Sequence, residues 1–89
     1  MAYRVSVTDA AKRDIARLAK TSPALVKKLG VLLDELKEHP HTGTGQCERL
    51  RHFETETWSR RINKEHRLVY QIHDDVVEVL VIAAFGHYA

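Results

Sequence analysis

Alternation of apolar and polar residues at the start of the chain predicts a short strand that leads into a helix. Residues 3–7 alternate, and Val5 and Val7 are β-branched, as is typical of strands. Thr8 or Asp9 can then cap a helix, because either side chain can accept a hydrogen bond from its first turn. One face of that helix is apolar, and it consists of Ala11, Ile15, Leu18 and Ala19.

A second helix is predicted directly afterwards. Ser22 is placed to cap it, and Pro23 suits the first helical position, where no backbone N–H is needed. The helix should end near Glu38, because the residue that precedes Pro40 is driven out of the helical region. Its apolar stripe consists of Leu25, Leu29, Leu32, Leu33 and Leu36. The two helices should therefore form a hairpin that buries one apolar face.

After a loop at 41–45 the pattern changes to a period of two, which predicts β-structure. The candidate strands cover 46–51, 58–62, 66–73 and 77–85. Helices followed by hairpin-linked strands form the α+β pattern. We expect a single domain over residues 1–89, with an N-terminal strand, a two-helix hairpin, and then an antiparallel sheet of three to four further strands with the helices packed on one face. The other face would be open to solvent or a ligand.

Side-chain alternation predicts which residues occupy that open face. In strand 66–73 the apolar positions 68, 70 and 72 should point at the helices, which leaves Arg67, Val69 and Gln71 outward. In strand 58–62 an inward Ile62 leaves Arg61 outward with Ser59. Arg61 and Arg67 can then converge on one anion.

Arg60 is the exception to this pattern. Alternation places it on the inner face with Trp58, so we expect it at the margin of the sheet, where its guanidinium reaches water or stacks on the indole. The arginines of the open face also fit a plain solvated surface, in which they pair with Glu54, Glu56 or Glu65.

Charge alone does not identify a partner. The 89 residues include 14 Lys+Arg and 12 Asp+Glu, for a net charge of +2, so the distribution of charge has to carry the argument. From residue 46 onward Lys64 is the only lysine, and every other basic residue is arginine, the better planar ligand for phosphate. With Cys47 alone no intrachain disulfide can form, and we find no signal-peptide core and no apolar run of about 18 residues. We therefore expect a cytoplasmic protein without a membrane segment.

Two stretches carry a family resemblance. Residues 58–62 (WSRRI) and 65–70 (EHRLVY) resemble the signature of the YoeB/Txe toxins, a branch of the RelE superfamily. Upstream, Gly43, Gly45, Glu48 and Leu50 resemble that family's GxGxPExL loop, and the ending His87-Tyr88 is similar to its terminal His-Tyr. The element order agrees over the whole chain, and close identity covers roughly residues 40 to 70 and the tail.

The resemblance implies a toxin of a type II toxin–antitoxin system that cuts mRNA in the ribosomal A site. It implies Glu48 as general base, His87 as general acid, Arg61 and Arg67 as phosphate clamps, and Tyr88 as a residue that orients the RNA. Side chains expected to contact RNA around these are Arg49, Arg51, Arg60, Lys64 and His66. The implied partners are a cognate antitoxin, mRNA on the ribosome, operator DNA only through the antitoxin complex, and a second copy in a homodimer.

The chemistry is consistent with these assignments. Cutting RNA without a metal requires a base for the 2′-hydroxyl, an acid for the departing 5′-oxygen, and cations for the crowded phosphorane. Imidazole, with an unperturbed pKa of about 6.5, suits proton transfer at neutral pH. Other interpretations stay open: Glu48 can be an ion-pair partner of the arginines, and His87 an ordinary exposed histidine.

Three departures from the family pattern bear on activity. Cys47 stands where the family has proline beside the base, residues 53–57 replace a loop that carries a glycine and an aromatic residue, and Ala89 follows Tyr88. None of them removes a matched catalytic residue.

Other functions are weighed against the ribonuclease. A metal site or cofactor is not expected, because His39-x-His41 and His73-Asp74-Asp75 lack the spacing of known zinc motifs. A ParE-like toxin would share the fold and act on DNA gyrase without ribonuclease activity. A catalytically weak module that binds antitoxin and operator DNA is the third possibility.

Overall fold

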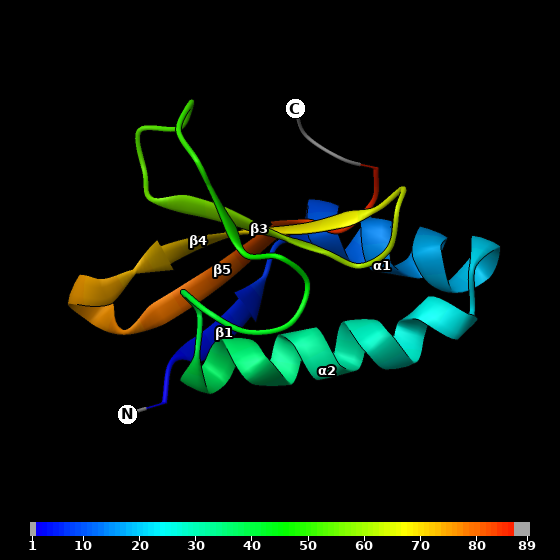
Figure 1. Ribbon diagram of the computed structural model, residues 1–89, viewed down its shortest axis with the longest axis horizontal. Coiled ribbons are helices and arrows are strands. Elements are labelled where there is room, and N and C mark those ends of the chain that lie inside the picture. The colour runs from blue at the N-terminus through cyan, green and yellow to red at the C-terminus, as the bar shows by residue number, and fades with distance from the viewer. Residues whose placement is uncertain (1, 87–89) are drawn as a thin grey trace.

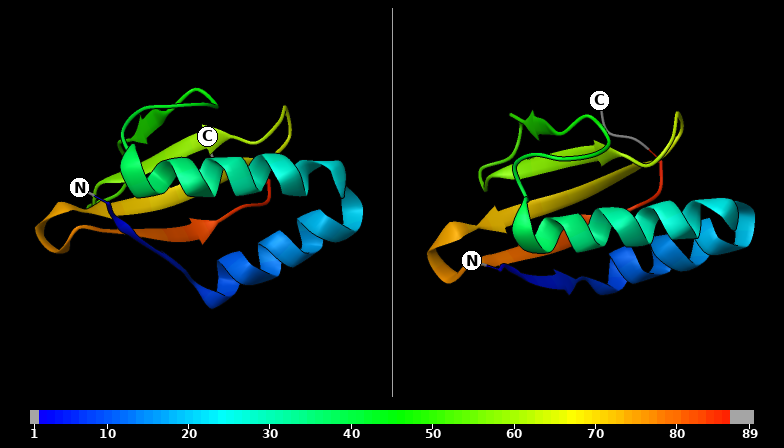
Figure 2. Two further views of the ribbon diagram at one scale, coloured as in Figure 1. Left: turned by 90° about the horizontal axis from the view of Figure 1, so that it is seen from below. Right: turned by 60° about the horizontal axis from the view of Figure 1, so that its bottom comes forward.

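The computed structural model describes residues 2–86 and forms two layers, a five-stranded sheet and a pair of helices. Strand β1 (Arg4–Val7) leads into helices α1 (Asp9–Thr21) and α2 (Ala24–Glu38). The remaining strands are β2 (Glu48–Leu50), β3 (Thr57–Arg61), β4 (Arg67–His73) and β5 (Glu78–Ala83), and a 3-10 turn, η1 (Asp74–Val76), joins β4 to β5. Figure 1 shows the two helices running below and behind the strands, and Figure 2 confirms this from two other sides.

The predicted α+β order is therefore confirmed, and the structure adds one detail. The strand order is β1-β5-β4-β3-β2, and every pairing is antiparallel except that of β1 with β5, which is parallel. A parallel pair needs a long crossover, and the helical hairpin between β1 and β2 forms part of it. None of the helices in the described part of the chain has the length and apolar character needed to cross a membrane.

Helix ends follow the predicted signals only in part. The Thr8 hydroxyl accepts from the backbone N–H of Ala11 at 3.1 Å, as an N-cap should. The predicted cap of α2 is wrong: Ser22 ends α1, with its backbone N–H bonded to Leu18, and its side chain makes no cap hydrogen bond to α2. With only Ser22 and Pro23 between the two helices, the serine closes one helix instead of opening the next.

The main core lies between the sheet and the helices, as the alternation predicts. Inward residues of β4 and β5 pack there against the leucines of α2 and Leu18 of α1; the buried set includes Leu29, Leu32, Leu36, Leu68, Tyr70, Ile72, Val79 and Val81. A second, smaller cluster of Leu50, Val69 and Ala83 lies on the other face. Val69 is thus fully buried, and that face is not wholly open, because Leu50 of the edge strand reaches over β3 to cover it.

Candidate functional site

The side chains of Glu48, Arg61 and Arg67 share the face of the sheet opposite the helices. Strand register sets Glu48 opposite Ser59 and Arg61 opposite Arg67. Arg67 Nη1 lies 3.8 Å from Glu48 Oε2 and donates to Ser59 Oγ at 3.5 Å. Glu48 keeps 64% of its side chain exposed and Arg67 only 18%, so an accessible carboxylate lies beside an anchored guanidinium.

The glycine loop that precedes Glu48 packs directly on β3. The backbone N–H of Arg61 donates to the carbonyl of Gly45 at 2.5 Å. Gly45 has a φ of +94°, and a Cβ there would lie 2.7 Å from the carbonyl oxygen of Arg61. Only glycine satisfies both the backbone conformation and the close approach. The contact with β3 therefore fixes the position of the loop that leads into β2. It also fixes the position of Glu48, the first residue of that strand.

Arg60 is buried and structural, which corrects both the sheet-margin placement and its place among the RNA-binding residues. Its side chain is 0% exposed and donates to Glu35 Oε1 at 2.9 Å, to the Tyr70 hydroxyl at 3.0 Å, and to the carbonyls of His39 and Thr42. The guanidinium lies 5.7 Å from the centre of the Tyr70 ring, and no contact with the indole of Trp58 is found among the described residues. With its donors engaged inside the protein, Arg60 ties helix α2 and the loop after it to β3.

Two neighbours of Arg60 show the electrostatic effect of this network. Hydrogen bonds from the Thr44 backbone and hydroxyl, and then the Arg60 charge, lower the pKa of the Glu35 carboxyl. Burial raises the pKa of Tyr70 to about 12, although Arg60 acts in the opposite direction. The Tyr70 hydroxyl therefore stays protonated and donates to the carbonyl of Pro40 at 2.8 Å.

The described chain ends beside the same site. Arg67 donates its backbone N–H to the carbonyl of Gly86 at 2.8 Å, and Gly86 donates to His66 Nδ1 at 2.9 Å. His66 is 6% exposed, and its ring lies 4.3 Å from that of Phe85. His66 is therefore corrected from an RNA-contacting residue to one that holds the end of the chain. His87 and Tyr88 lie outside the described residues.

Helix α1 also contacts the segment that precedes Gly86, at Ala84 and Phe85. Asp14 Oδ2 accepts the backbone N–H of Ala84 at 3.0 Å, and the Arg17 guanidinium lies 4.1 Å from the centre of the Phe85 ring. Neither residue was singled out from the sequence, because only the fold brings a helix near the N-terminus against the C-terminal segment.

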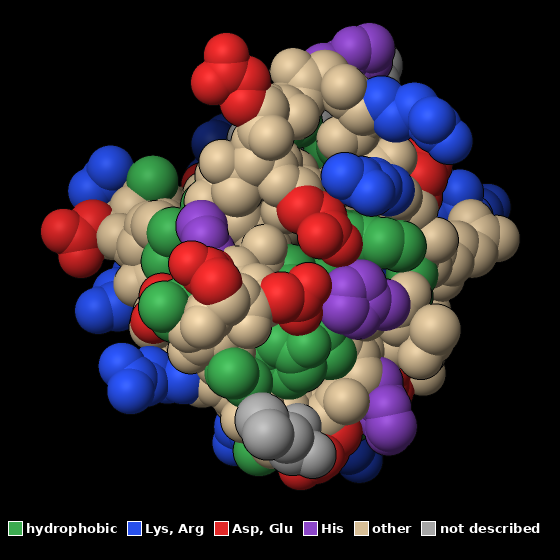
Figure 3. All heavy atoms as spheres, turned by 90° about the vertical axis from the view of Figure 1, so that its left-hand side faces the viewer, with side chains coloured by type: hydrophobic (Ala, Val, Ile, Leu, Met, Phe, Trp, Pro, Cys, Tyr) green, Lys and Arg blue, Asp and Glu red, His purple; other side chains and the backbone are tan. Residues whose placement is uncertain are grey.

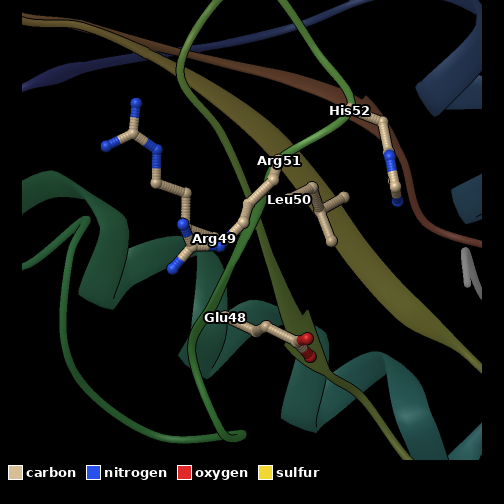
Figure 4. A pocket seen from close by; sticks show the side chains of 5 residues that line it. All are labelled: Glu48, Arg49, Leu50, Arg51 and His52. Atoms are coloured by element: carbon tan, nitrogen blue, oxygen red, sulfur yellow. The ribbon is translucent and has the colours of Figure 1, made fainter.

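Arg49 of β2 and Arg51, which follows β2, do not surround Glu48. Figure 4 shows Glu48 and Leu50 pointing to one side of the strand and Arg49 and Arg51 to the other. This follows from strand alternation, which sets Arg49 opposite Trp58. Arg49, Leu50 and Arg51 line an open pocket of about 370 Å³ together with Phe53. Lys64 is exposed, in the turn between β3 and β4. These basic groups can contact an anion, but they lie outside the group formed by Glu48, Arg61 and Arg67, which we call the Glu48 cluster.

Within residues 2–86, one group of side chains lies close enough together to bind a metal ion. His41, Glu56 and Asp74 bring three ligand atoms within 4.8 Å of one another. Glu56 precedes β3 and Asp74 follows β4. Glu48 lies at the other end of the sheet, because it is opposite Ser59 of β3, which is itself opposite Val69 near the start of β4. The chemistry available at the Glu48 cluster is that of a base beside fixed cations.

Comparisons with known proteins agree with this architecture. Residues 7–88 match the family model described as YoeB-like toxin of bacterial type II toxin-antitoxin system. Toxin YoeB of Escherichia coli K12 is 41% identical over 69 residues, which cover 78% of this chain and 80% of the relative.

Solved structures of such toxins superpose over nearly the whole chain. A YoeB/ParE toxin from Agrobacterium tumefaciens has a TM-score of 0.85 and 30% identity, covering 96% of this chain and 99% of that one. YoeB of Staphylococcus aureus, 29% identical, covers 99% of this chain and 100% of its own, with TM-scores of 0.82 as a dimer and 0.78 in a heterotetrameric complex with YefM. The chain therefore belongs to the family of YoeB-like toxins of bacterial type II toxin–antitoxin systems.

Proposed function

We propose that this toxin is an endoribonuclease that cuts mRNA in the A site of the ribosome without a catalytic metal. The observation that carries the proposal is the exposed Glu48 carboxylate, 3.8 Å from the Arg67 guanidinium, with Arg61 opposite Arg67 on the same face. A base next to two cations is what cleavage of a phosphodiester by an internal hydroxyl requires.

In the proposed reaction, Glu48 removes the proton from a 2′-hydroxyl of the message. The 2′-oxygen attacks the neighbouring phosphorus, and Arg61 and Arg67 stabilise the negative charge that accumulates on the phosphorane. The bond from phosphorus to the 5′-oxygen then breaks, and His87 protonates that oxygen. Gly86, which precedes His87 in the sequence, is hydrogen-bonded to the backbone of Arg67. Tyr88 orients the RNA.

This reaction gives a 2′,3′-cyclic phosphate and a 5′-hydroxyl end. DNA is inert, because it has no 2′-hydroxyl to attack. Exposed cations next to the cluster extend the RNA-binding surface: Arg49 and Arg51 with Phe53 at the pocket beside β2, and Lys64 in the β3–β4 turn.

Partners are proposed on the same basis. A cognate antitoxin would cover the basic open face with an acidic segment that becomes ordered on binding. Opposite charges on the two surfaces favour such an interaction. Contact with operator DNA would come only through that complex. The Staphylococcus aureus relative is seen as a dimer and with YefM, and a homodimer is consistent with the small core of this chain.

The test uses programmed ribosomes with a labelled message, and naked RNA in EDTA as a second arm. We compare the wild type with Glu48→Gln, Arg67→Ala and His87→Ala, and with Arg4→Ala as a control in an exposed arginine of β1. Cleavage of the message on the ribosome, no cleavage of the naked RNA, and a reduction of at least about 100-fold by the first three changes are the expected results. The fragment ends should carry a cyclic phosphate.

Absence of cleavage by the folded wild type would overturn the proposal. A supercoiling assay with DNA gyrase then tests the ParE-like alternative, which the fold alone does not separate from a ribonuclease. Binding of antitoxin and operator DNA without either activity would indicate the non-enzymatic module.

A further inference from the structure

A second polar cluster lies at the end of the molecule away from Glu48. It joins three segments: His41 from the loop after α2, Glu56 just before β3, and Asp74 at the start of η1. Figure 3 shows the end of the molecule that carries the β4–β5 turn, and acidic and histidine side chains lie side by side near its centre. The seven residues of β4 separate the cluster from Arg67 by roughly 20 Å, so it is no part of the proposed ribonuclease site.

The distances in the cluster are close to those of ligands around one ion. His41 Nε2 lies 3.4 Å from Glu56 Oε2 and 3.9 Å from Asp74 Oδ2. Two ligands bound at about 2.1 Å to a tetrahedral ion are about 3.4 Å apart. Of the three pairs, His41–Glu56 already has this spacing and His41–Asp74 needs a shift of about half an ångström. The Glu56–Asp74 pair lies within 4.8 Å and would have to close around the ion.

Aromatic donors orient both carboxylates. The indole N–H of Trp58 donates to Glu56 Oε2 at 2.8 Å, and the Tyr3 hydroxyl donates to Asp74 Oδ1 at 2.6 Å, which leaves Asp74 Oδ2 directed at His41. Carboxylates that bind metal ions are characteristically held by such outer hydrogen bonds.

Accessibility also suits an ion. The side chains of His41, Glu56 and Asp74 are 41%, 27% and 54% exposed, so an ion can enter and keep water on its remaining positions. An imidazole combined with two carboxylates favours a first-row transition ion such as Zn²⁺ over Mg²⁺ or Ca²⁺, which prefer oxygen ligands alone.

We propose that His41, Glu56 and Asp74 bind one divalent transition-metal ion, represented by Zn²⁺. The ion would fasten the loop after α2 to the β4–β5 turn and to the start of β3. Arg60 holds that loop already, through the carbonyls of His39 and Thr42, so the ion adds a tether from the solvent side. Its role is structural, and it is independent of whether the toxin cuts RNA.

The chain contains its own reporter for this proposal. Trp58 is the only tryptophan; it bonds to Glu56, and its ring lies 5.6 Å from that of His41. Metal-free protein is titrated with Zn²⁺ while Trp58 fluorescence, bound zinc per chain and the melting temperature are measured. We expect one saturable site, a change in Trp58 emission, and a rise in Tm of about 10 °C at free Zn²⁺ near 100 times the Kd.

Two variants and a matched control decide the outcome. His41→Ala and Asp74→Asn should bind Zn²⁺ at least about tenfold more weakly, while melting near the wild type without metal, since both side chains are partly exposed. His39→Ala removes an exposed histidine two residues away and should bind Zn²⁺ as the wild type does. Equal Zn²⁺ affinity in His41→Ala and the wild type, or no change in Trp58 emission on saturation, would overturn the site.

Discussion

The backbone N–H of Arg67 is hydrogen-bonded to the carbonyl of Gly86 at 2.8 Å. This bond joins the first residue of β4 to the last described residue of the chain. The guanidinium of the same arginine lies 3.8 Å from Glu48. Arg67 thus links the proposed base to the segment that leads to the proposed acid, and changes that disturb this link should act on cleavage through distance and orientation.

His66 should act as a positioning residue. His66→Ala removes the acceptor for the Gly86 N–H and the ring beside Phe85, so the segment that precedes His87 would lose its anchor. We expect single-turnover cleavage on the ribosome to fall about tenfold or more, with ribosome binding retained. His73→Ala is the control, because His73 bonds only to Gln71 at the far end of β4. Equal cleavage by both variants in the folded state would contradict this role.

Adjacent arginines of β3 should give opposite results. Arg60→Met removes the Arg60 hydrogen bonds to Glu35, the Tyr70 hydroxyl and two carbonyls, and should lower the free energy of unfolding by about 3 kcal/mol. This is the lower end for a broken buried pair, because Glu35 is 25% exposed. Arg61→Met should change stability by less than about 0.5 kcal/mol and reduce cleavage instead.

Urea denaturation and ribosomal cleavage together test this pair. Arg60→Lys serves as a further variant, and it should not restore stability, because an ammonium cannot replace a planar guanidinium with several fixed donors. If Arg61→Met destabilised the protein as much as Arg60→Met, the division between a structural and a catalytic arginine would be wrong.

The two glycines 45 and 30 should respond oppositely to alanine. Gly45→Ala places a Cβ 2.7 Å from a β3 carbonyl at a φ of +94°, so the loop must move, and both stability and cleavage should fall. Gly30 lies in α2, and a Cβ added there would meet nothing within 4 Å, so Gly30→Ala should raise the free energy of unfolding by about 0.5 to 1 kcal/mol. Thermal melts measure both, and a stable, fully active Gly45→Ala would refute the packing argument.

Lowering the pH should remove the contribution that the charged Glu35 carboxylate makes to the stability of the fold. Its pKa is lowered in the folded protein, chiefly by the hydrogen bonds from Thr44 and then by Arg60, so the stabilisation is complete above the unfolded value of about 4.3 and is lost as pH falls below it. The wild type should therefore exceed Glu35→Gln in unfolding free energy at pH 7, and the difference should shrink between about pH 5 and pH 3. A difference that stays constant over that range would show that Glu35 does not stabilise the fold through its charge.

Sequence patterning predicted the fold well wherever each segment determines its own structure. The change from helical to twofold periodicity near residue 45 located the helices and strands, and alternation assigned Leu68 and Tyr70 to the helix side. It did not predict that Val69 would be covered by Leu50, because that depends on how far the sheet curls between strands distant in sequence. Nor does local pattern indicate that β1 pairs parallel with β5.

For the candidate site, motif spacing identified Glu48, Arg61 and Arg67, and the structure brings them to one face. The motif did not separate structural from functional members. Arg60 and His66 lie inside the matched signature, yet both are buried, as hydrogen-bonding partners of other elements. The cluster of His41, Glu56 and Asp74 was missed because its members come from three separate segments, and no spacing along the chain indicates such a group.

The position of β5 has a consequence for how the protein folds during its synthesis. Ribosomes synthesise this strand last among the five, yet it lies inside the sheet between β1 and β4, and the segment after it closes onto Arg67 and α1. The N-terminal strand has no strand to pair with until residues 78–83 exist, so this pairing must wait for a contact between residues far apart in the sequence. A nascent chain therefore lacks the finished sheet, and the contacts of residues 84–86 with Arg67 and α1, until these residues have been synthesised.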